Sequence, residues 1–252
     1  MANRKILVTG SSRGIGPAIA EAFARAGDRV AVHHRENPAL AAAVAASLPG
    51  DGHVVVQADI ANPAQVAAMV DDAVARLGGL DVLVNNAASY GRVAHPISEV
   101  SYEQWQRAWR DTIDLNLIGA ANVTWCAVRH LIAAGGGRIV NVSSRGAFRG
   151  EPDHPAYGAS KAGLNALGQS LAVALAPLGI RVAGVAPGFV QTDMAAPHQD
   201  GEAGAAIRAQ SPFGRVARPE EIAAAVVFLA SPVAEWASGA ILDLNGASYL
   251  RT

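Results

Sequence analysis

KILVTGSSRGIG, residues 5–16, joins a short apolar run to a glycine-rich turn and leads directly into Pro17. An apolar run without polar alternation is typical of a strand covered on both faces, and proline suits the first position of a helix. Glycines at 10, 14 and 16 permit a tight turn and let backbone amides approach a ligand. The stretch therefore predicts a strand, a loop and a helix whose N-terminus binds a pyrophosphate; a tight turn without a ligand is the alternative.

Short β-branched runs recur along the chain, each ended by a glycine or a polar residue. We predict seven strands, in KILVTG, RVAVHH, HVVVQAD, LDVLVNN, GRIVNVSS, IRVAGVAPG and GAILDLNG. Ala- and Leu-rich stretches between them predict helices at 17–26, 38–48, 63–77, 101–133, 157–178 and 219–230. This alternation implies a single α/β domain over residues 1–252, a Rossmann-type fold with a doubly wound, seven-stranded parallel sheet and helices on both faces. The irregular stretch 187–217 follows a strand's carboxyl end, where such sheets bind ligands, and we expect a mobile substrate loop there.

Composition narrows the possible partners and the compartment. The formal net charge is −1 and no block of like charge occurs, so we expect neither nucleic acid nor a membrane as a partner. Cys126 is the only cysteine, which excludes an intrachain disulfide and is typical of a reducing compartment. The apolar run near the N-terminus is too short for a signal peptide. We therefore expect a cytoplasmic protein that binds small molecules or copies of itself.

A cationic cluster ends the second predicted strand, where residues 30–36 read VAVHHRE. NAD-binding versions of this unit place an acid there to accept hydrogen bonds from the ribose 2′-hydroxyl. Here the position holds His33, His34 and Arg35, and a guanidinium matches a 2′-phosphate in charge and geometry. Arg13 in the glycine loop is expected to approach the same phosphate from the other side. The cluster predicts NADP(H) in preference to NAD(H).

Other interpretations of these residues remain open. The cluster also fits a solvated strand end with incidental charge, whereas a metal site is disfavoured because adjacent histidines on a strand point to opposite faces. Asp59, which follows the third predicted strand and precedes Ile60, fits either a contact with the adenine or a cap on the next helix.

Tyr157 and Lys161 lie four residues apart at the start of a predicted helix, and hence on one face of it. A tyrosine with a pKa of about 10 is a weak acid until a neighbouring cation favours its phenolate. Eighteen of the twenty basic residues are arginine, so a lysine here indicates a need for a compact ammonium with three donors. The pair predicts proton transfer to a forming alkoxide, and an ordinary helix pair is the alternative.

The chain resembles the short-chain dehydrogenase/reductase family over nearly all its residues. TGSSRGIG, NNAA at 85–88, Asn116 in DLNLIG, Ser144 thirteen residues before Tyr157, YGASK and PGFVQT at 187–192 follow the family's order and spacing. Ala88 departs from the NNAG of the family but removes no functional group. The resemblance implies a catalytic set in which Tyr157 donates the proton, Ser144 holds the substrate oxygen, Lys161 lowers the tyrosine's pKa and Asn116 completes a proton relay.

The resemblance also assigns cofactor contacts, with Thr192 near the nicotinamide amide. Together with the loop and the strand end, the predicted cofactor residues are Gly10, Ser12, Arg13, Gly14, Ile15, Gly16, His34, Arg35, Asp59, Ile60, Asn86, Ala87, Tyr157, Lys161, Pro187, Gly188, Val190 and Thr192. No metal ligand is predicted. The implied enzyme is an NADPH-dependent reductase of a ketone or 3-oxoacyl group. An alcohol dehydrogenase working in the oxidative direction is one alternative, and a non-catalytic nucleotide sensor is another.

Within the family the similarity is greatest to 3-oxoacyl-acyl-carrier-protein reductases, through SSRGIG, APGFVQTDM, RPEEIAAAVVFLAS and LDLNGASYL. Those reductases tend to carry basic residues for their acidic carrier protein where this chain has AAGGG (133–137) and APLG (176–179). The sequence therefore predicts weak steering of an acyl carrier protein and a free small-molecule carbonyl or alcohol as substrate. The expected pocket lining, including Arg145, Phe148, His154 and Phe189, does not specify that substrate.

A homotetramer of 222 symmetry is the assembly that the resemblance implies. The stretch 101–133 carries Trp105, Trp109, Trp125 and Leu131, and the chain ends in an apolar strand. Large apolar patches are unusual on monomers, so we expect these residues at interfaces, with burial in the core as the alternative.

Overall fold

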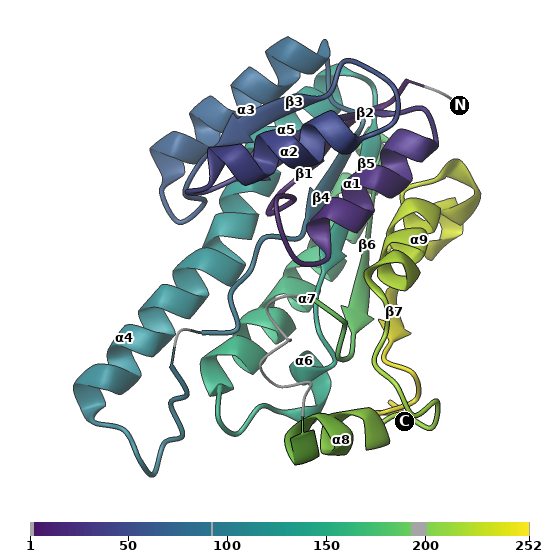
Figure 1. Cartoon of the computed structure of the whole chain (residues 1–252). Coiled ribbons are helices and arrows are strands. Elements are labelled where there is room, and N and C mark those ends of the chain that lie inside the picture. The colour runs from purple at the N-terminus through teal and green to yellow at the C-terminus, as the bar shows by residue number, and fades with distance from the viewer. Residues whose placement is uncertain (1–2, 92, 193–200, 252) are drawn as a thin grey trace.

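Seven parallel strands form one sheet in the computed structural model, which describes residues 3–91, 93–192 and 201–251 (Figure 1). The strands are β1 (Lys5–Val8), β2 (Arg29–His34), β3 (Val54–Gln57), β4 (Val82–Asn85), β5 (Gly137–Val142), β6 (Ile180–Pro187) and β7 (Ile241–Leu244). Each lies within one of the seven predicted runs. The apolar runs therefore identified the sheet correctly, because both of its faces are buried.

The order of the strands is β3-β2-β1-β4-β5-β6-β7. Val8 at the end of β1 pairs with Val32 of β2 on one side and with Val84 of β4 on the other. The chain thus winds outward from β1 in one direction and then returns to wind in the other. A crevice for ligands forms at the carboxyl ends of the strands where this reversal occurs, and the glycine loop leaves β1 at that point.

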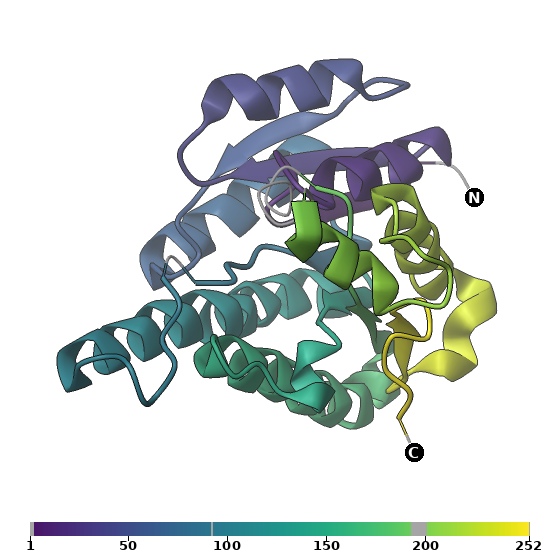
Figure 2. The same cartoon turned by 60° about the horizontal axis from the view of Figure 1, so that its bottom comes forward.

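Helices cover both faces of the sheet and build one core on each (Figures 1 and 2). One layer comprises α1 (Gly16–Arg25), α2 (Pro38–Ser47) and α9 (Pro219–Leu229), and the other α3 (Pro63–Leu77), α5 (Ala120–Ala133) and α7 (Pro155–Leu175). Phe23 of α1 and Leu131 of α5 are fully buried in the two cores. The structure confirms the doubly wound α/β fold. None of the helices in the described ranges has the length and apolar character that a membrane crossing would need.

The predicted helix at 101–133 is interrupted. It consists of α4 (Tyr102–Ile113), a π-helical turn (Asp114–Gly119) and α5. A Cβ on Gly119 would lie 2.8 Å from the carbonyl oxygen of Ile60, so the turn passes close to the chain that follows β3. The predicted helix at 157–178 begins two residues earlier and ends at Leu175, before a 3₁₀ turn (Ala176–Leu178).

Two α-helices of the described ranges were not predicted. The short α6 (Gly146–Arg149) follows β5, and α8 (Gly201–Ala209) lies within the stretch 187–217 that was expected to be irregular. Regular structure in the second half of that stretch corrects the expectation of a loop throughout. Residues 193–200 lie outside the described ranges, and the mobility of the stretch stays a prediction.

Candidate active site

The glycine loop between β1 and α1 is fixed by the segment that follows β4. Thr9 Oγ1 accepts hydrogen bonds from the backbone N–H groups of Asn86 and Ala87, each 3.0 Å long, and Asn86 Nδ2 donates to the carbonyl oxygens of Thr9 (2.9 Å) and Gly10 (3.1 Å). Gly10 has φ +63°, and a Cβ there would lie 2.8 Å from Ala87 Cα. The predicted supporting residue Asn86 therefore acts by bracing the loop itself.

Gly14 serves a different purpose in the same loop. Its φ is +69°, but a Cβ at this position would meet no atom within 4 Å. The loop therefore leaves space above Gly14 at the N-terminus of α1. Open space beside a helix N-terminus is what a pyrophosphate requires, and the residues of the loop fit that group. Of the other predicted loop residues, Ser12 is buried, Ile15 is half-buried and Arg13 is exposed.

His33 connects the glycine loop to the neighbouring strand. Its Nδ1 accepts a hydrogen bond from the backbone N–H of Gly10 (2.8 Å), and its Nε2 lies 3.0 Å from the carbonyl oxygen of Ala58. Both bonds are made only when the imidazole is neutral with its proton on Nε2. Burial, as the main cause, lowers the pKa of His33 to about 4. The sequence placed this histidine in a cationic cluster, but the structure makes it a neutral support of the loop.

We expect the free energy of unfolding to fall as the pH drops from 7 to 4.5, because protonation of His33 opposes folding. The folded pKa of about 4 lies below the ordinary value of 6.5, so this contribution to stability is complete above pH 6.5 and is lost towards pH 4. Between pH 7 and pH 4.5 the loss of unfolding free energy amounts to roughly 2 to 3 kcal/mol. Urea unfolding at both pH values should show a drop smaller by that amount in His33→Asn, which keeps an acceptor for Gly10. Equal pH dependence in the two proteins would contradict the assignment.

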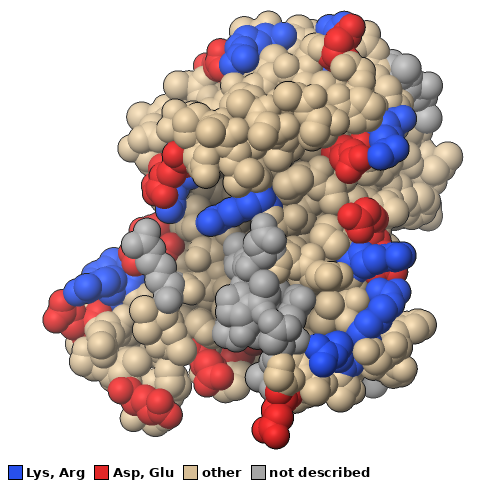
Figure 3. Space-filling view, viewed as in Figure 1, with Lys and Arg blue, Asp and Glu red and all other residues tan. Residues whose placement is uncertain are grey.

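The end of β2 presents basic groups that lack full pairing. His34 is buried, and its Nδ1 has no hydrogen-bond partner among the described residues. Arg35 is half-buried and its only ion pair in the described part of the chain is with its exposed neighbour Glu36, at 2.8 Å. A solvent-exposed pair of this kind contributes little and is easily exchanged. A hollow crosses the middle of the molecule in the space-filling view, and Lys or Arg side chains lie within it (Figure 3).

Asp59 does not cap the following helix, which corrects one of the two alternatives. Asn62 caps α3 by accepting from the N–H groups of Ala64 and Gln65. The Asp59 carboxylate instead accepts from the N–H of Ala61, at 3.0 Å. Asp59 is half-buried, and an adenine contact by its remaining oxygen stays a prediction. Ile60 is buried in the core.

Ser144, Tyr157 and Lys161 meet at the carboxyl end of β5. Tyr157 and Lys161 are the third and seventh residues of α7, and the side chains of Ser144 and Tyr157 are hydrogen-bonded. The Ser144 Oγ also accepts from the N–H of Gly146 (3.0 Å). Lys161 is buried; its Nζ donates to the carbonyl oxygen of Val142 (2.8 Å) and lies 5.8 Å from the centre of the Tyr157 ring. Spacing alone predicted this pair on one helical face.

Asn116 occupies the π-helical turn between α4 and α5. Its Oδ1 accepts from the N–H of Ser89 (2.9 Å), while its Nδ2 donates to the carbonyl oxygen of Ser89 (2.8 Å) and to Ser160 Oγ (3.1 Å). Asn116 thereby links the segment after β4 to α7, one residue from Lys161. A π-turn is rare and frequently occurs at functional sites. The structure places all four predicted catalytic residues at one edge of the sheet.

Burial sets the charge states of Tyr157 and Lys161. It raises the pKa of Tyr157 to about 12, against the opposing hydrogen bond from Ser144, and lowers the pKa of Lys161 to about 8. The net shift of the tyrosine is opposite to the lowering that was expected from Lys161. Tyr157 is consequently a neutral O–H donor at pH 7. The ammonium of Lys161 holds its proton less tightly than an exposed lysine does.

Tyr90, an aromatic residue that the sequence did not single out, packs beside Tyr157. The ring of Tyr90 lies 4.7 Å from the ring of Tyr157 and 4.0 Å from that of His154, centre to centre. The Tyr90 O–H donates to Glu151 Oε2, at 3.0 Å. No periodic signal marks Tyr90, because it lies in an irregular segment after β4.

The PGFVQT segment begins at Pro187, the last residue of β6, and is bonded to Arg145 on one side and to β7 on the other. The carbonyl oxygen of Pro187 accepts from the N–H of Arg145 (2.9 Å), and the N–H of Gly188 donates to Leu244 (3.1 Å). Val190 is buried and forms a bridge with Ala217. Thr192, at the end of a described range, is half-buried. These residues lie at the sheet edge that carries the predicted catalytic groups, and their contacts with a cofactor remain predictions.

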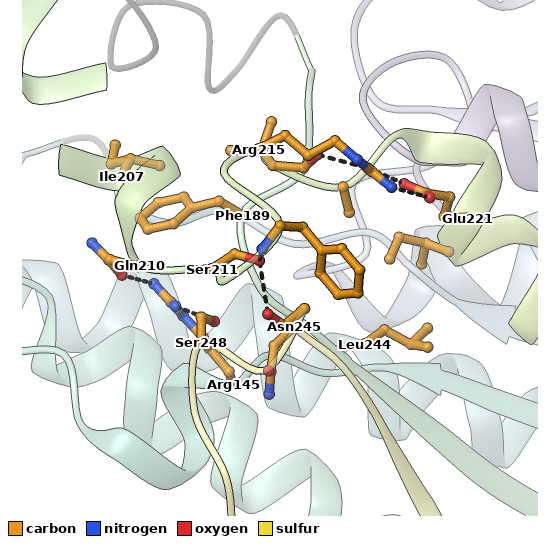
Figure 4. Close-up of a pocket in the computed structure, with 15 residues that line it drawn as sticks. Arg145, Phe189, Ile207, Gln210, Ser211, Arg215, Glu221, Leu244, Asn245 and Ser248 are labelled. Carbon is orange, nitrogen blue, oxygen red and sulfur yellow. Dashed lines mark hydrogen bonds and ion pairs between the residues drawn. The ribbon is translucent and has the colours of Figure 1, made fainter. Parts of the chain in front are cut away.

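A cavity of about 220 Å³ lies beside Phe189 of this segment (Figure 4). It is lined by Arg145, Phe189, Ile207, Gln210, Ser211, Phe213, Arg215, Val216, Ala217, Glu221, Ile222, Leu244, Asn245, Gly246 and Ser248. Two of the expected pocket residues, Arg145 and Phe189, line it. Phe148 and His154 do not: the guanidinium of Arg251 lies over the Phe148 ring, and His154 stacks on Tyr90.

Known proteins resemble this chain over nearly its whole length. The profile of a family described as "Enoyl-(Acyl carrier protein) reductase" matches residues 10–246. The cis-4-hydroxycyclohexanecarboxylate dehydrogenase of Sinomonas cyclohexanicum is 40% identical over 245 residues, covering 97% of this chain and 96% of the relative. A short-chain type dehydrogenase/reductase structure from Mycobacterium ulcerans has a TM-score of 0.90 at 30% identity, covering 98% and 91% of the two chains. A Brucella melitensis 3-ketoacyl-(acyl-carrier-protein) reductase, solved with NADH, has a TM-score of 0.87 at 31% identity, covering 98% of each.

Proposed function

Because the chain belongs to the short-chain dehydrogenase/reductase family, we propose that it is an NADPH-dependent reductase that converts a small-molecule ketone or 3-oxoacyl group to a secondary alcohol. The observation that carries the proposal is the convergence of Ser144, Tyr157, Lys161 and Asn116 at the sheet edge where the glycine loop opens. A scaffold or sensor that had lost catalysis would have no need of a buried ammonium beside a neutral tyrosine. The set therefore argues for an enzyme.

The roles of the residues follow from their charge states. When bound, the cofactor supplies the hydride. Ser144 Oγ and the Tyr157 O–H both face the substrate oxygen in the proposed complex, and Tyr157 donates its proton as negative charge develops there. The ammonium of Lys161 stabilises the resulting phenolate. Asn116, which is hydrogen-bonded to Ser89 and to Ser160, fixes the segment after β4 against α7.

The basic end of β2 supports a preference for NADPH. A buried histidine nitrogen without a partner, the weakly engaged guanidinium of Arg35 and the exposed Arg13 form a donor set without a buried acid. Such a set suits a dianionic 2′-phosphate better than a ribose hydroxyl. The Brucella melitensis reductase was solved with NADH, so the preference for NADPH is proposed from the residues at the β2 end of this chain alone.

Oxidation of a secondary alcohol at the same site is the second candidate function. It is favoured by the name of the Sinomonas cyclohexanicum relative, a dehydrogenase of a hydroxy acid. The residues would act in reverse, with Tyr157 removing the hydroxyl proton. The reaction conditions decide which direction runs, because the same four residues can serve both the reduction and the oxidation.

An assay with both cofactors and a small panel tests the proposal. Purified protein is incubated with NADPH or NADH and linear, cyclic and 3-oxoacyl ketones, and with NADP or NAD and the matching alcohols, while absorbance at the reduced nicotinamide is followed. We expect turnover of at least one ketone with NADPH. Tyr157→Phe serves as the control for contaminating activity, and equal rates with that variant, or no turnover in either direction, would contradict the proposal.

We propose that the carrier protein is not the preferred acyl carrier. Segments 133–137 and 176–179, where the basic residues are missing, lie together: Gly137 N–H donates to the carbonyl oxygen of Gly179 (3.2 Å). Both lie at the amino ends of β5 and β6, the opposite edge of the sheet from Ser144. An acidic partner docked there would gain no electrostatic steering from these segments.

We expect a homotetramer in solution. Trp236 and Val233, in the 3₁₀ turn (Pro232–Ala237) before β7, are 99% and 80% exposed, and a second apolar group on α4 and α5 includes Trp125. Leu131, which was expected at an interface, is fully buried in the core, and Trp105 and Trp109 are half-buried. Two separate apolar faces suit the two isologous interfaces of 222 symmetry. Light scattering at micromolar concentration should give the tetramer mass, and Trp236→Glu should lower it; a monomer in the unsubstituted protein would contradict the expectation.

A further inference from the structure

Arg145 is a buried cation next to catalytic Ser144. The residue is 4% exposed, although arginine is rarely buried without a charged partner. Its Nη1 donates to Ser248 Oγ (2.5 Å), its Nη2 donates to Gln210 Oε1 (2.6 Å), and the guanidinium lies 4.7 Å from the centre of the Phe189 ring (Figure 4). All three partners are uncharged. Burial and the neighbouring Arg149 lower the pKa of Arg145, and the charge of Glu151 compensates only part of this lowering.

The acid in the wall of the same cavity is already engaged. Both carboxylate oxygens of Glu221 accept from Arg215, each at 2.7 Å, and one of them also accepts from the N–H of Arg218. In Figure 4 this ion pair lies on the other side of the cavity from Arg145. Among the described residues no carboxylate pairs with Arg145. The cavity wall therefore carries an excess of one positive charge.

Arg145 is also close to the groups around Tyr157. It interacts electrostatically with Glu151 and Tyr90, and the same Glu151 influences Tyr157. The backbone N–H of Arg145 is bonded to Pro187, so the residue is fixed between the catalytic serine and the PGFVQT segment. Arg145 directly follows Ser144 and lines the cavity, so a substrate whose carbonyl lies at Ser144 can present a second polar group to it.

We infer that Arg145 forms a carboxylate subsite, and that the substrate of the proposed reduction is a compact oxo acid, or hydroxy acid in the reverse direction. The inference rests on the proposed function for the reaction but on Arg145 and its cavity for the charge. A guanidinium offers the fork that a carboxylate accepts in bidentate fashion, and a buried site strengthens the interaction. A cavity of about 220 Å³ suits a small branched or cyclic acid rather than a long acyl chain.

Pairs of substrates that differ only in charge test the inference. We would compare 4-oxocyclohexanecarboxylate with its carboxamide, and 4-oxopentanoate with its carboxamide, in the wild type, Arg145→Gln and Arg145→Lys. The wild type should prefer an acid over its amide by at least about 10-fold in kcat/KM, and Arg145→Gln should lower the acid value by about 10- to 100-fold while the amide value changes little. Arg145→Lys should recover only part of the loss, because it keeps the charge without the fork.

Two further variants separate the subsite from general charge and from folding. Arg149→Gln removes an exposed guanidinium that bonds the same Gln210 oxygen, at 3.1 Å, and should leave the preference for acids in place. Gln210→Glu keeps Arg145 and gives it an internal counter-ion, so it should fold at least as stably as the wild type and lose the preference by about 10-fold. This variant decides the matter if Arg145→Gln fails to fold.

Binding of cyclohexanecarboxylate, which has no carbonyl to reduce, gives a readout without turnover. Calorimetry should detect binding to the wild type and a loss of about 10-fold or more in Arg145→Gln and Gln210→Glu. Binding of this kind without reduction of any ketone would leave the subsite standing and refute the proposed reaction. Reduction of ketones with equal kcat/KM for acids and amides, and no Arg145-dependent binding, would refute the subsite and leave the reductase.

Discussion

Replacing Tyr157 with phenylalanine is expected to lower kcat by about 10²- to 10⁴-fold, the usual scale for loss of a general acid. The substitution removes one oxygen atom, which is hydrogen-bonded to Ser144, and keeps the ring that packs against Tyr90. Because the buried tyrosine is neutral at pH 7, folding and cofactor affinity should be preserved. Single-turnover kinetics with NADPH and the best ketone of the panel would measure the loss, and fluorescence titration would measure cofactor binding.

Tyr102→Phe provides the matched control, since it removes the same atom from an exposed residue at the start of α4. Its kcat should stay within about 2-fold of the wild type, as is usual for surface changes away from a site. A Tyr157→Phe protein that kept most of its activity would show that another group donates the proton, with the neighbouring Tyr90 as the first to examine.

The sheet was predictable because its inner strands are buried on both faces, so that the sequence of each is a nearly continuous apolar run. VAV in β2 and VLV in β4 are examples, and both lie in the core. The break at 114–119 was not predictable, since a π-turn adds one residue to a turn without disturbing the apolar spacing on either side. Gly119 at its end lies close to Ile60, which follows β3 and is distant in sequence.

The candidate site was predictable only where its residues are near one another in sequence or follow a spaced motif. Tyr157 and Lys161 met both conditions. His33 met neither: its two hydrogen bonds join Gly10 and Ala58, and only the fold brings those residues together. The upward shift of the Tyr157 pKa likewise depends on burial, which a pair of residues four apart does not reveal.

The sequence also could not reveal whether Arg145 is paired with a carboxylate. Its position after Ser144 marked it as pocket lining, but its lack of a carboxylate partner in the described ranges follows from the positions of Gln210 and Ser248, which are 65 and 103 residues away. A sequence records that an arginine is present, whereas its pairing is a property of the assembled structure. The substrate therefore had to be inferred from the cavity rather than from a motif.

Arg35→Asp is expected to reverse the cofactor preference, with a combined change of about 10²- to 10⁴-fold in the ratio of the NADH and NADPH dissociation constants. One charge-assisted hydrogen bond to the 2′-phosphate contributes roughly 1.5 to 3 kcal/mol, and the new carboxylate repels that phosphate while accepting from a ribose 2′-hydroxyl. The native ion pair of Arg35 with exposed Glu36 costs little to lose. The stability of the variant should therefore be close to that of the wild type.

Calorimetric titration with NADPH and NADH, which differ only in that phosphate, measures the ratio directly. Arg25→Gln is the control, because this exposed arginine lies at the far end of α1 and pairs with Glu21; it should leave the ratio within about 2-fold. Raising the salt concentration should weaken NADP more than NAD in the wild type, since an additional charged contact is screened. If the wild type binds both cofactors equally, or if Arg35→Asp and Arg25→Gln behave alike, the basic end of β2 is a solvated strand end and not a phosphate site.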